Sequence, residues 1–142
     1  MRTFYLFKVK DEYSKLTKNI PYNLYNTYAS IRISNPDNLN YIYNQYKSIT
    51  EKVSVADINH YLMRAMEKYD GYSIYRNTHM YNNYYSDEVS KLVIYNSYFI
   101  LKCNKSASTF LSVLYHIPNL FVIDFENKDY FWLKNADLTL AP

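Results

Sequence analysis

Glycine is almost absent from this sequence of 142 residues, which contains a single one, Gly71. Loops that cradle nucleotide phosphates need several glycines at fixed spacing, because the backbone must approach the phosphate closely. Neither the P-loop pattern nor the dinucleotide-binding pattern can be written with one glycine. The sequence therefore excludes the enzyme classes that depend on these two motifs.

Cysteine is equally scarce, since Cys103 is the only one. A disulfide framework needs pairs of cysteines, and a cysteine-based zinc site needs several at short spacing. Neither can form within this chain. Cys103 closes an apolar stretch, where we expect it to be a small buried side chain without a chemical role.

Long hydrophobic runs are missing as well. No run approaches the roughly 18 apolar residues that a membrane-spanning helix needs, and Met1–Tyr5 lead directly into an alternating stretch rather than into a signal peptide. We therefore expect a soluble, cytoplasmic protein that does not engage a membrane.

The chain also lacks a strong excess of charge. Sixteen Lys and Arg residues stand against thirteen Asp and Glu residues, which gives a net charge of +3, and only four of the basic residues are Arg. Nucleic-acid binders usually carry a basic stripe with arginines for bidentate contacts. Here the charges alternate in sign along the chain, which favours a mixed solvated surface, and we expect no direct contact with nucleic acid.

No catalytic or metal-binding set can be assembled from the remaining polar residues. The histidines, which stand far apart and without other metal ligands at suitable spacing, are His60, His79 and His116. Ser106 and Ser108 begin a predicted helix, where capping explains them. Asp124 and Glu126 precede a polar stretch, and we interpret them as turn residues rather than as an acid–base pair. We expect no enzymatic activity, no cofactor and no small-molecule substrate.

Tyrosine is what the chain has in abundance, with nineteen residues. Genomes rich in A and T encode much Tyr, Asn, Lys and Ile, which explains the number without special chemistry. Exposed tyrosines suit protein interfaces, and stacked tyrosines also bind single-stranded nucleic acid. That second function remains the alternative, although the cluster of positive charge it needs is missing. The residues alone favour a protein-interaction module, with its partner open.

The C-terminal third, from Lys91 to Leu133, carries the clearest structural signal. Its segments are rich in β-branched and aromatic residues and are separated by short polar links, a pattern typical of hairpins. We predict two strands at 91–95 and 98–102 joined by Asn96–Ser97, a helix at 106–117 that ends at Pro118, and two strands at 120–125 and 130–133 joined across 126–129.

The first strand of the predicted sheet is Thr3–Lys10, which is apolar on both faces and therefore belongs inside the sheet. A short helix follows at 11–18, with Tyr13, Leu16 and Thr17 on one face. For the middle of the chain we predict irregular or weakly helical structure at 22–34, helices at 36–50 (capped by Asn35) and 55–69 (capped by Ser54), a strand at 72–75 and a loop at 77–86.

These segments predict an α/β fold of the α+β kind, one layered domain over residues 1–142. A mostly antiparallel sheet, made of the first strand and the two hairpins, would be covered by about three helices at 36–50, 55–69 and 106–117. The passage from strand 98–103 through a helix to strand 120–125 would give a parallel or a crossover arrangement, right-handed if parallel.

Two stretches of the chain carry a distinctive order of residues. Phe121–Leu133 contains a hydrophobic run, Asp-Phe, a polar turn with Lys, and Tyr-x-Trp-Leu. Arg2–Tyr13 is an aromatic strand that runs into Lys, two acidic residues and an aromatic residue. Both stretches resemble the sporulation inhibitor of replication family, SirA, the second being similar to the start of that family. Because the segments between Lys91 and Asp124 fall at compatible spacing, the resemblance covers both ends and about half of the chain.

The resemblance implies a small α/β protein that binds the N-terminal domain of the replication initiator DnaA. Such a protein inhibits initiation at the chromosome origin by occupying a surface, with no reaction catalysed. The segment that the resemblance implies as partner-binding follows the first strand and contains Asp11, Glu12, Tyr13, Leu16 and Thr17. Tyr13 corresponds to the first aromatic residue of the family's contact segment. Where the family has its next aromatic residue, this chain has Thr17, with Leu16 as the apolar neighbour.

Overall fold

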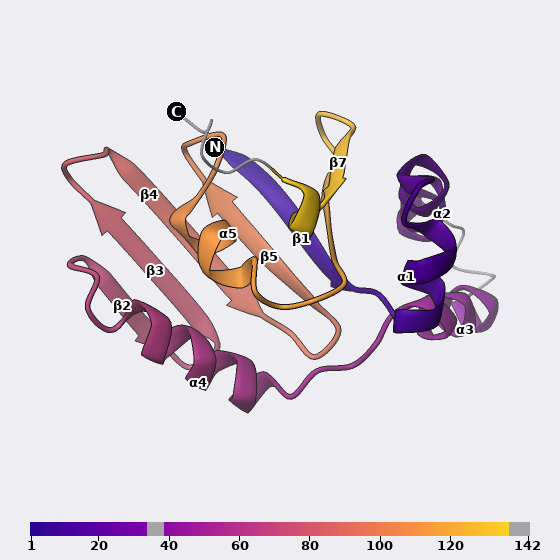
Figure 1. Cartoon of the computed structure of the whole chain (residues 1–142), viewed down its shortest axis with the longest axis horizontal. Helices are drawn as coiled ribbons and strands as arrows, with labels where there is room; N and C mark the ends of the chain where they lie inside the picture. The colour runs from indigo at the N-terminus through magenta and orange to yellow at the C-terminus, as the bar shows by residue number, and fades with distance from the viewer. Residues whose placement is uncertain (34–38, 137–142) are drawn as a thin grey trace.

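The computed structural model describes residues 1–33 and 39–136, whose helices and strands are shown in Figure 1. The strands are β1 (Arg2–Lys8), β2 (Tyr72–Tyr75), β3 (Thr78–Asn83), β4 (Glu88–Ile94), β5 (Tyr98–Cys103), β6 (Leu120–Asp124) and β7 (Asp129–Trp132). The helices are α1 (Asp11–Thr17), α2 (Pro21–Ile33), α3 (Leu39–Ile49), α4 (Val55–Met66) and α5 (Thr109–Leu114), and a short 3-10 helix, η2 (Leu133–Asn135), follows β7.

The seven strands form one sheet in the order β2-β3-β4-β5-β1-β6-β7, and every pair of neighbours is antiparallel. This arrangement confirms the predicted α+β class and the antiparallel sheet. Both C-terminal hairpins form, since Ile94 pairs with Phe99 and Asp124 pairs with Asp129. The sheet also includes β2 and β3, and the described residues contain five α-helices rather than about three.

β1 lies in the interior of the sheet, between β5 and β6. Its alternating side chains are divided as the sequence predicts: Phe4 and Leu6 belong to the core on one face, and Phe7 belongs to the core on the other. Because β5 and β6 each pair with β1, they run parallel to one another without pairing directly. The connection through α5 is therefore a crossover over β1.

α4 and α5 cover one face of the sheet, in front of the strands in Figure 1. Leu62 and Met66 of α4 and Phe110 and Leu114 of α5 are buried against β1, β4 and β5. Burial of apolar side chains at this spacing is what holds a short helix on a sheet.

Ser54 and Ser108 cap helices as the sequence predicts, whereas Ser106 lies before the cap of α5 and does not cap it. The backbone N–H of Asp57 donates to Ser54 Oγ at 3.2 Å, and that of Phe110 donates to Ser108 Oγ at 3.1 Å. Each serine satisfies a backbone donor that the first turn of a helix leaves unpaired. α4 nevertheless ends at Met66, before the predicted Tyr69, and α5 is shorter than predicted at both ends.

α2 and α3 contribute to a second core on the other face of the sheet, and Figure 1 shows them grouped with α1 on the right. Leu24 and Tyr28 of α2 and Ile49 of α3 pack with Phe7 and Phe121 of the sheet. The predicted start of α3, with Asn35 as its cap and Pro36 as its first residue, lies outside the described residues.

The sequence left irregular or weakly helical structure open at 22–34; residues 22–33 form most of the regular helix α2, so the irregular alternative is wrong, and residue 34 lies outside the described residues. Pro21 occupies the first helical position, where its fixed φ and missing N–H are favourable. Leu24 and Tyr28 lie one turn apart and are buried. Polar residues stand between the tyrosines in the first half of the helix, so the sequence shows little contrast between its faces.

The prediction of a loop at 77–86 is also wrong. β3 occupies most of this stretch and pairs with β2 on one side and β4 on the other. His79 and Tyr81 point into the core and are buried, whereas Met80 and Asn82 face outward. The residues alternate between inward and outward as in a strand, but one inward residue is a histidine, so the apolar alternation that predicts a strand is broken.

His79 is accommodated in the core by two hydrogen bonds. Its Nδ1 lies 2.8 Å from the hydroxyl of Tyr72, and its Nε2 lies 2.7 Å from Oδ1 of Asn59. Since an amide oxygen only accepts, Nε2 carries the proton and Nδ1 accepts from Tyr72. Burial lowers the pKa of His79 to about 4, so the ring is neutral near pH 7.

Two further properties concern the part of the chain that the structure describes. None of its helices combines the length and the apolar character that crossing a membrane demands. Its His, Cys, Asp and Glu residues form no group of three that could hold a metal ion.

Candidate partner-binding surface

α1 follows directly after the interior strand β1, and its entry is tied to two distant segments. The backbone N–H of Val9 donates to the carbonyl of Asn119 at 2.9 Å, and that of Lys10 donates to the carbonyl of Ile49 at 2.8 Å. Val9 also forms an isolated β-bridge with Thr50. The position of the first turn of α1 is therefore fixed by the link before β6 and by the end of α3.

The buried face of α1 is attached through Asn119 as well. Ser14 is buried, and its hydroxyl donates to Asn119 Oδ1 at 2.9 Å. The amide group of Asn119 in turn lies 3.4 Å from Oδ1 of Asp11, to which it donates. Asn119 adopts a φ of +62°, a left-handed conformation that Asn tolerates better than most residues.

The acidic residues predicted for this site, Asp11 and Glu12, are exposed in the first turn of α1. Negative charge is favourable there because it lies near the positive end of the helix dipole. Asp11 forms an ion pair with Lys15 one turn away, with 3.2 Å between the charged atoms. The hydrogen bonds from Lys15 and Asn119 lower the pKa of Asp11.

The three remaining predicted residues do not share one accessible face. Leu16 exposes 74% of its surface, Tyr13 is half-buried against the second core, and Thr17 exposes only 4%. The hydroxyl of Thr17 donates to the carbonyl of Tyr13 at 2.8 Å, a bond within the helix. The accessible set, called the α1 surface below, is therefore Asp11, Glu12, Tyr13 and Leu16.

Two apolar residues that the sequence reading left out lie next to the α1 surface along the chain. Ile20 exposes 46% and Tyr22 exposes 59% of its surface, between the end of α1 and the first turn of α2. Ile20 follows Leu16 at the spacing of one helical turn. This spacing is visible in the sequence and could have indicated that Ile20 extends the surface.

Of the pair Asp124 and Glu126, which could in principle act as an acid–base pair, Asp124 has a structural role. Asp124 is buried and accepts hydrogen bonds from Arg2 Nε at 3.0 Å and from the side chain of Asn127 at 2.7 Å. Burial acts to raise the pKa of Asp124, but the hydrogen bonds from Asn127 and Arg2 outweigh it and lower the pKa. Glu126 is exposed, which agrees with the interpretation of this pair as turn chemistry.

Comparison with known proteins bears on the whole chain. A family model described as sporulation inhibitor of replication protein SirA matches residues 2–137. The match includes the α1 surface and both stretches in which the sequence shows the resemblance. No curated protein matches the chain.

Proposed function

This chain belongs to the SirA family of sporulation inhibitors of replication, and from that membership we propose that it acts by binding the N-terminal domain of DnaA. The binding is stoichiometric, and the inhibitor catalyses no reaction. It blocks initiation because a bound inhibitor covers a DnaA surface that other factors need. The proposed contact is the α1 surface, with Thr17 supporting it from beneath.

The observation that supports this proposal most is the exposure of Leu16 on a helix whose entry is fixed. A single exposed leucine is ordinary on a protein surface. Leu16, however, lies one turn of α1 after the half-buried Tyr13 and four residues before the exposed Ile20. Anchoring through Asn119 and Ile49 orders these side chains before binding, which reduces the entropy lost on association.

The charge on the α1 surface adds a second requirement for the partner. Asp11 and Glu12 are exposed at its rim, and Lys15 neutralises only one of them. A partner surface with an apolar groove and a basic rim is complementary to this arrangement. Rim charges of this kind act mainly on the rate of association and on specificity.

Titration calorimetry with the purified DnaA N-terminal domain tests the proposal. We expect a saturable complex, and we expect Tyr13→Ala to weaken it by about tenfold or more, since buried tyrosine anchors are frequent hot spots. Tyr85→Ala is the matched control, because Tyr85 is fully exposed in the turn after β3. It should leave the affinity unchanged.

Two results would count against the proposal. The first is the absence of binding to the DnaA domain by a folded wild-type chain. The second is equal affinity for wild type and Tyr13→Ala, which would move the contact away from α1. Tight binding of single-stranded DNA with a steep dependence on salt would instead favour the nucleic-acid alternative.

A further inference from the structure

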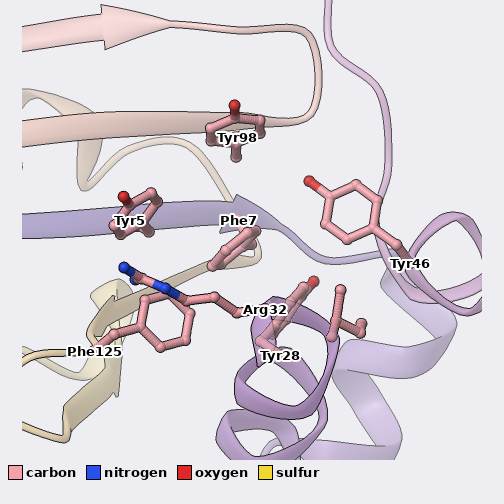
Figure 2. Close-up of a pocket in the computed structure, with 8 residues that line it drawn as sticks. Tyr5, Phe7, Tyr28, Arg32, Tyr46, Tyr98 and Phe125 are labelled. Atoms are coloured by element: carbon pink, nitrogen blue, oxygen red, sulfur yellow. The ribbon is translucent and has the colours of Figure 1, made fainter. Parts of the chain in front are cut away.

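A pocket of about 390 Å³ opens on the face of the sheet opposite α4 and α5. Its walls come from β1, β5, α2, α3 and the residue after β6, and Figure 2 shows seven of the lining side chains by name. Most of the lining is aromatic or aliphatic: Tyr5, Phe7, Tyr28, Ile31, Tyr46, Tyr98 and Phe125, together with Arg32. The volume is in the range of pockets that hold small molecules.

Arg32 is the one charged side chain in this lining. Its guanidinium carbon lies 4.5 Å from the ring centre of Phe125 and 5.2 Å from that of Tyr5, and Figure 2 shows the group between these two rings. Within residues 1–33 and 39–136, no carboxylate forms an ion pair with Arg32. The stacking holds the guanidinium at the pocket while its N–H groups remain donors for a ligand.

The hydroxyl groups of the pocket fall into two kinds. Those of Tyr28 and Tyr46 are already used, because they lie 2.8 Å from Thr50 Oγ1 and from Ser97 Oγ. Those of Tyr5 and Tyr98 form no hydrogen bond with another described residue. The pocket therefore offers a ligand a broad apolar wall, one cation and two hydroxyls.

We propose that this pocket binds a small organic acid with a compact apolar body, such as an aryl-alkyl carboxylate. The carboxylate pairs with the Arg32 guanidinium, and the body packs against the rings of Phe7, Tyr28 and Phe125. An ion pair with a stacked guanidinium is directional, so it fixes the orientation of the acid. The apolar wall supplies most of the contact area.

Other occupants fit the walls less well. An extended peptide gains affinity by adding a strand to a sheet edge, but β1 and β5 are paired on both sides. A nucleobase carries several polar edge atoms, and a wall with few free polar groups would leave most of them unpaired. Both remain as outcomes of the test below.

The pocket is distinct from the α1 surface, because none of Asp11, Glu12, Tyr13 and Leu16 lines it. The inference therefore does not depend on the proposed function. A chain that fails to bind DnaA can still bind the acid, and the reverse is equally possible.

Two probes of the same shape test the proposal on the full chain: 3-phenylpropanoate and its neutral amide. Titration followed by protein-observed NMR should show the acid binding about tenfold or more tightly than the amide, as a charge-assisted hydrogen bond implies. Arg32→Met should remove this difference. Arg64→Met is the control, because Arg64 is exposed on α4 and does not line the pocket.

The perturbed resonances should include Tyr5, Tyr98 and Phe125. Equal affinity for acid and amide on the wild-type chain would overturn the proposal, and this comparison needs no variant to fold. Loss of binding in Arg64→Met would also overturn the proposal. The same holds if thymidine monophosphate or an acidic peptide binds more tightly than the acid. Unchanged thermal unfolding of Arg32→Met confirms that its result reports the ligand contact.

Discussion

The hydroxyl of Ser14 and Oδ1 of Asn119 are joined by a hydrogen bond of 2.9 Å across 105 positions of the chain. The same asparagine accepts the backbone N–H of Val9 at the entry to α1. Asn119 thus fixes both the direction in which the chain leaves β1 and the face of α1 that turns inward. The proposed contact surface depends on a residue that follows α5.

Ser14→Ala should therefore lower the free energy of unfolding by about 1 kcal/mol, because the half-buried Oδ1 of Asn119 loses the donor that the buried Ser14 provides. Urea denaturation measures this change. Ser112→Ala is a matched control, since Ser112 is exposed on α5 and donates only to the carbonyl of Thr109. It should change stability by less than about 0.5 kcal/mol. Equal effects of the two variants would contradict a structural role for the Ser14–Asn119 bond.

Substitutions at Leu16 and Thr17, which are adjacent in sequence, should have opposite effects on stability and on DnaA affinity. Leu16→Ala should leave stability nearly unchanged, because the side chain is exposed and Ala favours a helix, yet weaken DnaA binding about tenfold. Thr17→Ala should cost about 1 kcal/mol of stability and change the affinity of the folded protein little. Calorimetric binding and urea denaturation of both variants check this separation. A Leu16→Ala variant that binds normally would remove Leu16 from the contact.

The stability of the fold should decrease in mildly acidic solution because of His79. Its pKa is about 4 in the fold and near 6.5 in the unfolded chain. Between these values the unfolded state binds more protons, so the free energy of unfolding falls as the pH falls, by up to about 1.4 kcal/mol per pH unit and about 3 kcal/mol in all. Above pH 6.5 this contribution is fully present.

The variant His79→Gln isolates that effect. Between pH 6.5 and 5, its urea-denaturation midpoint should depend on pH less steeply than that of the wild type. The lowered pKa of Asp124 also makes stability fall with pH, but only as its carboxylate takes up a proton at lower pH. Parallel slopes for wild type and variant would show that His79 is not the group that titrates.

Glu88 is a buried carboxylate whose partners in the described chain are all neutral donors. It accepts from the hydroxyls of Ser90, Ser108 and Thr109 and from the backbone N–H of Thr109. Ser90 and Ser108 have second acceptors in Cys103 Sγ and Ser90 Oγ, whereas the hydroxyl and backbone N–H of Thr109 have only Glu88 among the described residues. Glu88→Ala leaves the Thr109 donors unpaired and should cost about 2–3 kcal/mol, measured by urea denaturation. Glu126→Ala, at an exposed position, is the control and should fall within about 0.5 kcal/mol of wild type.

The parts of the fold that the sequence predicts well are those set by neighbouring residues. The hairpin at Asn96–Ser97, the Ser54 cap and the two-sided strand β1 all follow from local alternation or spacing. β3 and α2 are not predicted because some of their buried residues are of types that are also common on surfaces. In β3, His79 is buried and satisfied by Tyr72 and Asn59. In α2, Tyr28 is buried, but the sequence does not distinguish it from the exposed tyrosines. Neither partner set can be read from local sequence.

For the candidate site, too, the sequence predicts the local structure but not the contacts with distant residues. The sequence places a short helix directly after β1, and the structure confirms it. Which side of that helix faces inward is decided by Asn119 and by the end of α3, both remote in sequence. Thr17 is buried for this reason, although its spacing from Tyr13 predicts a shared face. The position of β1 between β5 and β6 is equally non-local.

That position of β1 has a consequence for how the protein is made. Arg2 pairs with Cys103 and Lys8 pairs with Leu120, so the partners of this strand are synthesised long after the strand itself. Sheets that depend on such distant pairings close late. Asn119, which accepts from Val9 and Ser14, is synthesised with these late partners. A nascent chain that has not yet reached Asn119 therefore lacks the contacts that hold α1 in place.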